Sequence, residues 1–269
     1  MKLLYGSDLA GFIKERQAKQ VRALRQSHGI FPRLAIVTNT NNPVIDVYMR
    51  LKERYGADIL IDVEIHRASP DDTLRVIADL NARDDVQGII VQLPLENMDD
   101  MDMVLAAVDA TKDVDGLRPD STFDAPTPMA ITWLLAGHGI DLKQRRIVIV
   151  GRGRLVGAPL ERMWRNSHLN VHVFERGDAL ESLAQYDLIV TATGVPRLIS
   201  TQMVAPGAIV IDAGTAAENG VICGDTAPEV RERQDISITP EKGGVGPLTV
   251  AALFDNVINA CLTIANASK

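Results

Sequence analysis

The sequence predicts an α/β protein of two domains, each built on parallel strands. Short β-branched runs alternate with helical patterns along the whole chain, which is typical of strands joined by crossover helices. The strand candidates are almost wholly apolar, as expected for strands covered by helices on both faces. A Pro-rich break, Ala125-Pro126-Thr127-Pro128, separates two series of strands and indicates a junction between domains.

The first half of the chain contains three strand candidates and one well-marked helix. We expect strands at Leu34–Val37, Ile59–Val63 and Gly88–Val91. A helix should begin at Ser69-Pro70-Asp71-Asp72, because the serine can cap it, the proline suits a first turn and the aspartates complement the positive end of the helix dipole. This helix should end near Asn81.

The second half begins with an apolar helix around Ile131–Ala136 and ends with a helix at roughly Leu248–Ala265. Between them lie four strand candidates: Ile147–Val150, Val171–Phe174, Leu188–Thr191 and Ile209–Asp212. Their spacing predicts a Rossmann-like, doubly wound parallel sheet. The last helix is long enough to pack back against either domain, and we expect it to return to the N-terminal one.

Composition narrows the class of protein. The 269 residues include 28 Lys and Arg against 35 Asp and Glu, and the net charge of −7 argues against a nucleic-acid or anionic-membrane surface. Cys223 and Cys261 lie far apart with no Cys/His cluster, so neither a disulfide framework nor a metal site is expected. No stretch approaches the ~20 apolar residues of a membrane helix, so we expect a cytoplasmic protein.

A glycine-rich turn directly follows the strand Ile147–Val150. Gly151 and Gly153 allow a tight turn and close approach of a pyrophosphate, whose charge the N-terminus of the next helix can hold. Gly157 comes one position later than the third glycine of Gly-x-Gly-x-x-Gly. By itself the pattern therefore suits a dinucleotide site or a plain strand-turn-helix.

The following strand ends at Glu175-Arg176, and Glu175 comes 24 positions after Gly151, where an acid usually binds the adenosine ribose. A carboxylate favours the 2′-hydroxyl of NAD, whereas the guanidinium of Arg176 can pair with the 2′-phosphate of NADP. Charged residues at strand ends are also often simply solvated. The two residues leave the choice of dinucleotide open.

Four further features have both a catalytic and a plain structural interpretation. Tyr48 and Lys52 share one helix face, as any solvated pair four apart would. Gln92 follows the strand Gly88–Val91, where ligands bind in parallel sheets, or is a loop amide bonded to the backbone. Asp115 is a carboxylate acceptor or a turn residue before a glycine. The loop 243–247 allows close backbone approach to a ligand, or is a flexible turn.

Five ordered motifs, spread from about residue 32 to residue 260, make the chain resemble the methylenetetrahydrofolate dehydrogenase/methenyltetrahydrofolate cyclohydrolase family. They are Tyr48-Met49-Arg50-Leu51-Lys52, Val91-Gln92-Leu93-Pro94-Leu95, Lys112-Asp113-Val114-Asp115-Gly116, Gly151-Arg152 with Val156-Gly157, and Gly243-Gly244-Val245-Gly246-Pro247 with the following Leu248-Thr249-Val250-Ala251. The similarity covers nearly the whole chain.

The resemblance implies a role for each matching residue. Lys52 would be the general acid/base of the cyclohydrolase step, Gln92 would orient it, and Asp115 would bind the pterin; these three are the implied catalytic residues. The implied substrate-binding set is Tyr48, Lys52, Val91, Gln92, Leu93, Asp115, Gly243, Gly244, Val245 and Gly246. The implied cofactor-binding set is Gly151, Arg152, Gly153, Glu175, Arg176 and Thr215, with no metal ligand.

The resemblance also implies the reaction and the domains. Residues 1–125 with 248–269 would bind and process the folate, and residues 126–247 would bind the dinucleotide. The activities would be oxidation of 5,10-methylenetetrahydrofolate with NADP, NAD remaining possible, and hydrolysis of the product to 10-formyltetrahydrofolate. Such an enzyme would be a cytoplasmic homodimer in one-carbon metabolism, supplying purine and amino-acid biosynthesis, with no nucleic-acid or membrane partner.

Several positions depart from the family pattern. Gly153 replaces the usual serine of the turn, Lys242 replaces a proline, and Val44 and Ile45 replace a small residue and a serine. Two alternatives therefore stay open: a two-domain dehydrogenase of another small substrate, such as one of the shikimate or amino-acid type, and a dinucleotide-binding relative without catalytic activity. The folate enzyme is favoured because all four residues of the implied folate site are present: Tyr48, Lys52, Gln92 and Asp115.

Overall fold

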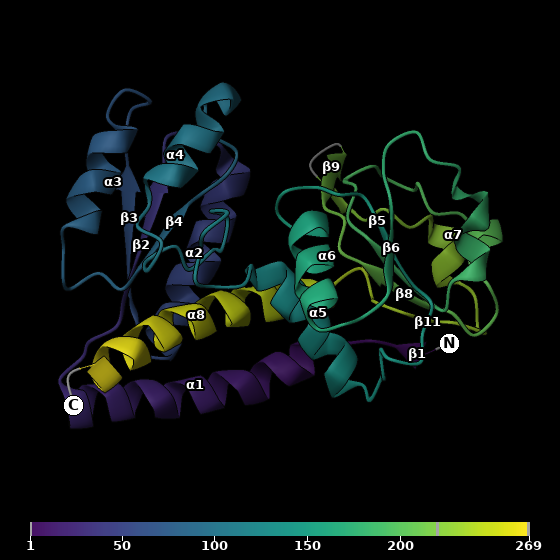
Figure 1. The fold of residues 1–269 in the computed structure, drawn as a ribbon, viewed down its shortest axis with the longest axis horizontal. Helices are drawn as coiled ribbons and strands as arrows, with labels where there is room; N and C mark the ends of the chain where they lie inside the picture. Colours follow the sequence, from purple (N-terminus) through teal and green to yellow (C-terminus); the bar gives the residue numbers. More distant parts are fainter. Residues whose placement is uncertain (1, 219–220, 268–269) are drawn as a thin grey trace. The chain divides into compact units, whose positions relative to one another are not determined.

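The structure, a computed structural model, describes residues 2–218 and 221–267 (Figure 1). The chain groups into two compact units. We call Gly11–Pro126 with Val250–Lys269 the first unit, and Met1–Ala10 with Thr127–Thr249 the second unit. Each unit has its own parallel sheet, so the predicted two-domain α/β fold is confirmed.

The first unit is built around a three-stranded parallel sheet in the order β3-β2-β4. The strands are β2 (Arg33–Thr38), β3 (Asp62–Arg67) and β4 (Gly88–Val91). The helices that belong wholly or largely to this unit are α1 (Ser7–His28), α2 (Pro43–Asp58), α3 (Thr73–Asn81), the 3-10 helix η1 (Met98–Asp100), α4 (Met101–Ala107) and α8 (Val245–Ala267).

Alternate residues of β2 enter two separate hydrophobic cores. Leu34 and Ile36 pack in a cluster with residues of α1, α2 and α8, among them Phe254. Ala35 and Val37 pack on the other face with residues of α3 and α4. Because both faces of the sheet are covered, the strand is apolar throughout, which explains the unbroken run seen in the sequence.

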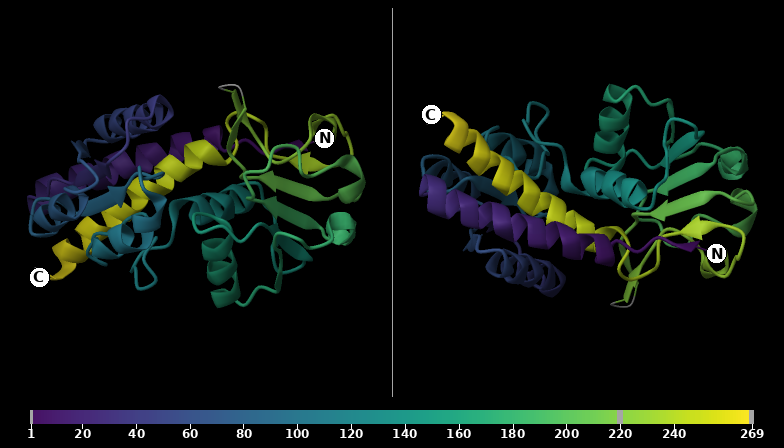
Figure 2. Two further views of the ribbon diagram at one scale, coloured as in Figure 1. Left: turned by 90° about the horizontal axis from the view of Figure 1, so that it is seen from above. Right: turned by 90° about the horizontal axis from the view of Figure 1, so that it is seen from below.

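The C-terminal helix α8 returns to the first unit, as the sequence predicts. In this unit α1 and α8 run side by side (Figure 2). Gln17 of α1 is fully buried and donates from its side-chain amide to the Ala251 carbonyl at 2.8 Å, while its amide oxygen accepts from the Tyr55 hydroxyl at 2.8 Å. The buried amide is therefore satisfied at both ends, which lets a polar group sit within the helix interface.

The second unit contains a six-stranded parallel sheet in the order β1-β11-β8-β7-β5-β6 and a two-stranded antiparallel sheet. The sheet strands are β1 (Lys2–Leu3), β5 (Ile147–Val150), β6 (Val171–Phe174), β7 (Leu188–Thr191), β8 (Ile209–Asp212) and β11 (Ser237–Ile238); β9 (Ala216–Glu218) pairs with β10 (Val221–Cys223). The helical elements are α5 (Pro126–Gly137), α6 (Gly157–Asn166), η2 (Leu180–Gln185), η3 (Thr201–Met203) and α7 (Pro228–Arg231). All four strands predicted in this half are confirmed.

The strand order places a topological switch at β5. From β5 the chain passes to β6 on one side, and then to β7 on the other side. In open parallel sheets, ligands bind outside the carboxyl ends of the strands at such a point. The glycine turn after β5 lies at this position in the second unit.

The first ten residues group with the second unit, whereas the sequence-based division placed them in the folate domain. The cause is strand β1, which pairs in parallel with β11, and the Leu4 amide continues this pairing by donating to the Ile238 carbonyl at 2.9 Å. A two-residue strand has too short an apolar pattern to be recognised in the sequence.

Two local predictions in the first unit were wrong. Strand β3 begins at Asp62 rather than at Ile59, because α2 extends to Asp58 and a turn follows in which Leu60 adopts a left-handed φ of 65°. Ile59 and Ile61 are nevertheless buried in the core. Their apolar character thus reflects burial in a turn, not a strand.

The helix expected from Ser69 begins four residues later, at Thr73. The Ser69 hydroxyl accepts from the Asp72 amide at 3.2 Å, but it does so across a separate turn that precedes α3. The helix ends at Asn81, as expected. The prediction that Ser69 caps the helix was therefore wrong: the N-cap residue is Asp72, which makes no side-chain cap bond, and the Ser69 hydroxyl stabilises the preceding turn instead.

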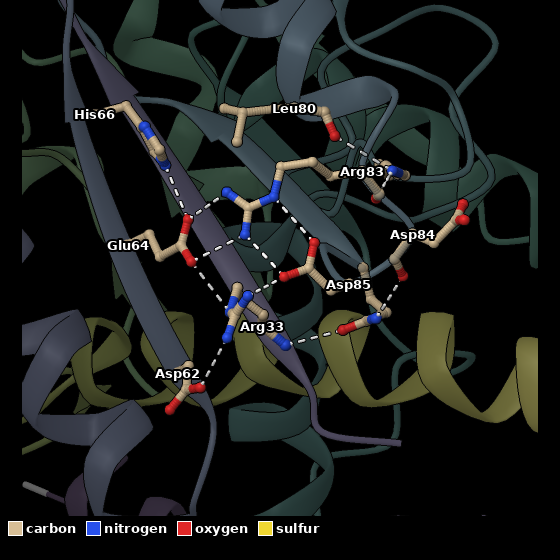
Figure 3. A network of polar contacts seen from close by, with 10 residues as sticks. Arg33, Asp62, Glu64, His66, Leu80, Arg83, Asp84 and Asp85 are labelled. Carbon is tan, nitrogen blue, oxygen red and sulfur yellow. Dashed lines mark hydrogen bonds and ion pairs between the residues drawn. The ribbon is translucent and has the colours of Figure 1, made fainter. Parts of the chain in front are cut away.

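A network of charged groups surrounds the amino ends of β2 and β3 in the first unit (Figure 3). Arg33 forms ion pairs with Asp85, with Asp62 at 3.3 Å and with Glu64 at 3.1 Å, and Arg83 contacts Glu64 at 2.8 Å. The Arg83 guanidinium lowers the pKa of Glu64, and it lowers the pKa of Asp85 to about 2. Because ligands bind at the carboxyl ends of parallel strands, we assign this network a structural role.

Helix α8 meets the length and composition of a membrane span: it has 23 residues and a mean hydropathy of 1.6 in its most apolar window. The sequence-based expectation that no segment reaches this apolarity was therefore wrong. In the structure 61% of that window is buried, and Phe254, Val257 and Cys261 lie in the core of the first unit. Burial in a protein core accounts for the apolar composition of α8.

Candidate active site

Lys52 and Gln92 are brought together in the first unit at the carboxyl ends of its strands. Helix α2 follows the carboxyl end of β2 and carries Lys52, while Gln92 directly follows β4. The Lys52 ammonium nitrogen donates to the Gln92 Oε1 at 2.7 Å. The other end of the same amide donates to the Leu93 carbonyl at 3.0 Å, which keeps Oε1 turned toward the lysine. The structure thus favours the orienting role for Gln92 over a plain loop amide.

Asp115 completes a coupled group with Lys52. Desolvation by burial lowers the pKa of Lys52, and the charge of Asp115 opposes part of that shift. Burial raises the pKa of Asp115 to about 6, and the charge of Lys52 opposes that shift in turn. Both side chains are half-buried, so they remain reachable from solvent. A lysine that loses its proton more readily than usual suits proton transfer near neutral pH.

The other predicted substrate-binding residues of the first unit differ in how far their side chains are exposed to solvent. Tyr48 lies one turn before Lys52, and its side chain is 37% exposed, while the neighbouring Met49 is buried in the core. Val91 is buried in the sheet interior, so only its main chain is available to a ligand. Leu93 is half-buried. These positions remain predictions as substrate contacts.

Asp115→Asn is expected to make the folded chain more stable at pH 8. The folded pKa of about 6 lies above the ordinary 3.8, so the Asp115 carboxyl favours folding below the lower value, and this contribution is lost as the pH rises through about 6. The asparagine amide does not ionise, so the variant does not lose this stability as the pH rises. A shift of this size corresponds to a gain of up to about 3 kcal/mol at pH 8, which falls to about 0.5 kcal/mol at pH 4. Urea unfolding at both pH values measures it.

Asp71→Asn is the matched control, because Asp71 is exposed on the same unit. The control should change the free energy of unfolding equally little at both pH values. If Asp115→Asn lowers stability at pH 8 relative to this control, the carboxylate is stabilising and the assigned cause of its pKa shift is wrong.

The glycine turn of the second unit is tightly packed on one side and open on the other. Gly151 has a φ of 94°, and its amide donates to the Phe174 carbonyl at 2.8 Å. A Cβ on Gly157 would lie 1.9 Å from the Gly151 carbonyl oxygen, whereas one on Gly153 would meet nothing closer than 3.9 Å. The first and third glycines are thus required by the fold, and Gly153 leaves room for a ligand.

Helix α6 begins at Gly157, directly after this turn, and its N-cap residue Val156 offers no side-chain acceptor. The Ala158 amide already donates to the Gly153 carbonyl at 3.1 Å and Pro159 has no amide proton, so within the first three helix residues the Gly157 amide is the candidate donor to an anion. Together with the open space at Gly153, this arrangement fits the pyrophosphate of a dinucleotide.

Arg152, in the turn, lies between two carboxylates. Its Nε contacts Glu161 of α6 at 2.8 Å, and its Nη1 contacts Glu175 at 3.4 Å. The first of these contacts is the main cause that raises the pKa of Arg152. Arg176 and Thr215 are exposed, at the ends of β6 and β8. Sequence reasoning missed Glu161, since an acid within an amphipathic helix carries no motif.

A buried acidic pair at the ends of β8 and beyond β10 was also missed. Asp212 accepts from the Thr226 hydroxyl at 2.6 Å and from Arg231 at 2.6 Å. Asp225 accepts from the Thr191 hydroxyl and from the Thr193 amide, each at 2.7 Å. A Cβ on Gly214 would clash with Asp225, which explains the glycine. These bonds fix the carboxyl ends of β7 and β8.

Asp212→Ala is expected to destabilise the chain by about 3–5 kcal/mol, because it leaves Arg231 unpaired in a nearly closed site. The Asp212 side chain is only 2% exposed. Chemical denaturation measures the effect. Asp187→Ala, which breaks the more exposed pair with Arg146, should cost about 1 kcal/mol or less. Equal losses in the two variants would contradict the assignment.

The glycine-rich loop packs against the chain start within the second unit. The Gly243 carbonyl accepts from the amides of Gly6 at 2.8 Å and Ser7 at 3.1 Å. Helix α8 begins at Val245, three residues before the expected start, so Val245 and Gly246 lie in its first turn. Pro247 suits that turn because its missing amide proton is not needed there. Of the four predicted substrate residues in this segment, Gly243 and Gly244 therefore lie in the loop, whereas Val245 and Gly246 belong to the helix.

Comparison with known proteins identifies both halves of the chain. Residues 4–115 match the family model described as "Tetrahydrofolate dehydrogenase/cyclohydrolase, catalytic domain". Residues 125–265 match the model described as "Tetrahydrofolate dehydrogenase/cyclohydrolase, NAD(P)-binding domain". A curated relative, "Bifunctional protein FolD" of Hydrogenobaculum, is 36% identical over 97% of this chain and 98% of its own length.

Solved structures give the same result. The FolD methylenetetrahydrofolate dehydrogenase/cyclohydrolase of Campylobacter jejuni has a TM-score of 0.91 at 33% identity, covering 98% of this chain and 99% of that one. The FolD of Trypanosoma brucei, solved with NADP cofactor and an inhibitor, has a TM-score of 0.90 at 26% identity, covering 97% of each chain.

Proposed function

The chain belongs to the tetrahydrofolate dehydrogenase/cyclohydrolase family, and on that premise we propose that it oxidises 5,10-methylenetetrahydrofolate with NADP and hydrolyses the product to 10-formyltetrahydrofolate. The observation that carries the proposal is the 2.7 Å contact between the Lys52 amine and the Gln92 amide oxygen, beside Asp115. A plain solvated lysine has no need of an oriented amide at the carboxyl ends of a sheet.

Lys52 moves the protons of the hydrolytic step. Water attacks the methenyl carbon, and the neutral Lys52 amine takes one proton from the attacking oxygen. The lysine returns this proton to N5 of the pterin as the carbon–N5 bond breaks, and the second proton of the water leaves to solvent. Gln92 fixes the amine for both transfers by accepting its hydrogen bond.

Asp115 binds the pterin. With a pKa of about 6 it is mostly ionised at neutral pH, and a carboxylate is the natural acceptor for the paired N–H groups of an aminopyrimidine. Tyr48 supplies an exposed ring near the same face of α2. Main-chain groups of Val91, Leu93, Gly243 and Gly244, with Val245 and Gly246, complete the proposed substrate set.

The second unit would hold the dinucleotide. Gly151, Gly153 and the start of α6 would bind the pyrophosphate, and Arg152, Glu175 and Arg176 would face the adenosine ribose. Thr215 follows β8 at the same edge of the sheet and would contact the cofactor. A nicotinamide held there would supply the acceptor for the hydride of the methylene carbon. The NADP complex of the Trypanosoma brucei relative supports NADP as the oxidant.

The biological setting follows from the same proposal. Residues 1–125 with 248–269 would process the folate and residues 126–247 would bind the dinucleotide, with the first ten residues contributing β1 to the second unit. We place the enzyme in the cytoplasm as a homodimer, in one-carbon metabolism that feeds purine and amino-acid synthesis.

The test supplies the purified chain with 5,10-methylenetetrahydrofolate and NADP, then with NAD, and follows reduced nicotinamide together with methenyl absorbance. We expect reduced nicotinamide to form and methenyl product to be hydrolysed faster than it is without protein. If neither signal changes with either dinucleotide at high protein concentration, the chain is a relative without catalytic activity.

A further inference from the structure

Two carboxylates, those of Glu161 and Glu175, contact Arg152 in the glycine turn of the second unit. We infer that Glu161 and Glu175 together weaken binding of the NADP 2′-phosphate and provide an acceptor for the NAD 2′-hydroxyl, so that the second unit binds both dinucleotides with similar affinity. This inference rests on the proposed dehydrogenase function. It adds NAD to NADP as a dinucleotide that the second unit binds.

Glu161 is the fixed member of this group. Its side chain is 12% exposed, and its two oxygens are held by Arg152 at 2.8 Å and by Arg165 at 3.0 Å. A guanidinium recognises phosphate best through two parallel N–H groups. Glu161 already accepts the hydrogen bond of Arg152 Nε, so the guanidinium edge that contains Nε cannot bind a phosphate as well. The negative charge of Glu161 also partly neutralises the positive charge that Arg152 would present to a phosphate.

Glu175 lies where the ribose is expected. It directly follows β6, whose last residue, Phe174, pairs with Val150 and accepts from the Gly151 amide at 2.8 Å. The Glu175 side chain is 58% exposed and approaches Arg152 Nη1 at 3.4 Å. Its own amide donates to Asp178 Oδ2 at 2.7 Å, which adds a second carboxylate to the same turn.

These charges act differently on the two ligands. A phosphate monoester carries about −1.5 to −2 charges at neutral pH, so it would meet Glu175 and Asp178 as like charges. A ribose hydroxyl can instead donate a hydrogen bond to Glu175. Arg176, exposed at the next position, supplies positive charge that keeps the 2′-phosphate bound. The result is a site with little net preference.

The experiment measures binding without turnover. Isothermal titration calorimetry with NADP and with NAD, in the absence of folate, gives both dissociation constants for the wild-type chain, Glu175→Gln, Glu161→Gln and the control Glu181→Gln. Glu181 is an exposed acid in η2, and its substitution changes the net charge equally. For the wild type we expect the two constants to lie within about tenfold of each other.

For Glu175→Gln we expect NADP to bind about tenfold more tightly and NAD severalfold more weakly, and for Glu161→Gln we expect a severalfold gain for NADP. The control should change neither ratio. The inference is overturned if the two wild-type constants differ by clearly more than about tenfold, if Glu175→Gln behaves like Glu181→Gln, or if neither dinucleotide binds.

A parallel assay of methylenetetrahydrofolate oxidation keeps the two ideas apart. Expected binding ratios without any turnover would refute the proposed function and leave the ribose assignment intact. Turnover with NADP, combined with unchanged ratios in both variants, would refute the ribose assignment alone.

Discussion

Lys52→Ala is expected to slow hydrolysis of 5,10-methenyltetrahydrofolate at least about 100-fold while sparing part of the oxidation step. General acid/base groups contribute about this much or more, and the Lys52 amine, oriented by Gln92 at 2.7 Å, is the group proposed to move both protons. Hydride transfer needs no proton from Lys52. The two rates are measured separately, from the loss of methenyl absorbance and from the formation of reduced nicotinamide.

Lys19→Ala provides the control, because Lys19 is an exposed lysine of α1 in the same unit. The Lys19→Ala variant should oxidise methylenetetrahydrofolate and hydrolyse the methenyl product at the wild-type rates. Gln92→Leu should slow hydrolysis as well, but by less, because the amine remains and only its orientation is lost. An equal loss of both activities in folded Lys52→Ala would instead assign Lys52 to substrate binding.

Gly157→Ala is expected to remove dinucleotide binding and to destabilise the chain by about 3 kcal/mol or more. The added Cβ would lie 1.9 Å from the Gly151 carbonyl oxygen and 2.8 Å from its carbon, so backbone must move. Because these atoms form the turn itself, a shift would displace the amides proposed to hold the pyrophosphate. Thermal denaturation and calorimetric titration with NADP measure the two effects.

Gly153→Ala is the matched control within the same turn. The nearest atom to its added Cβ is 3.9 Å away, so stability should change by about 0.5 kcal/mol or less. If Gly157→Ala is as stable as Gly153→Ala and binds NADP as well as the wild type does, the close packing of α6 on the turn is not required.

The sheet of the second unit was largely predictable from the sequence. Three of the four predicted strands, β5, β7 and β8, are short, apolar and almost wholly buried between neighbouring strands, so local pattern and tertiary packing agree. Strand β6 lies at the edge of the sheet, and of its residues only Val171 is fully buried. Predictions failed where the local sequence pattern and the tertiary packing favour different structures. Ile59 and Ile61 are apolar because a turn is buried, and β1 is a strand only because β11 lies beside it.

The candidate site shows the same limit. The family resemblance paired Lys52 with Gln92, but no local pattern of residues predicts their contact, which depends on where α2 and β4 lie in the folded unit. Glu161 and Asp225 carried no local signal, because their importance comes from Arg152 and Thr191, which lie 9 and 34 positions away in the sequence. Long-range ion pairs of this kind leave no periodic pattern in the sequence.

The most direct test is the product ratio during turnover of 5,10-methylenetetrahydrofolate with NADP. The wild-type chain should form one 10-formyltetrahydrofolate for each reduced nicotinamide, whereas Lys52→Ala should accumulate the methenyl intermediate at the rate at which it oxidises substrate. Absence of reduced nicotinamide in the wild type, or the same accumulation of methenyl product in both proteins, would contradict a single chain that performs both steps.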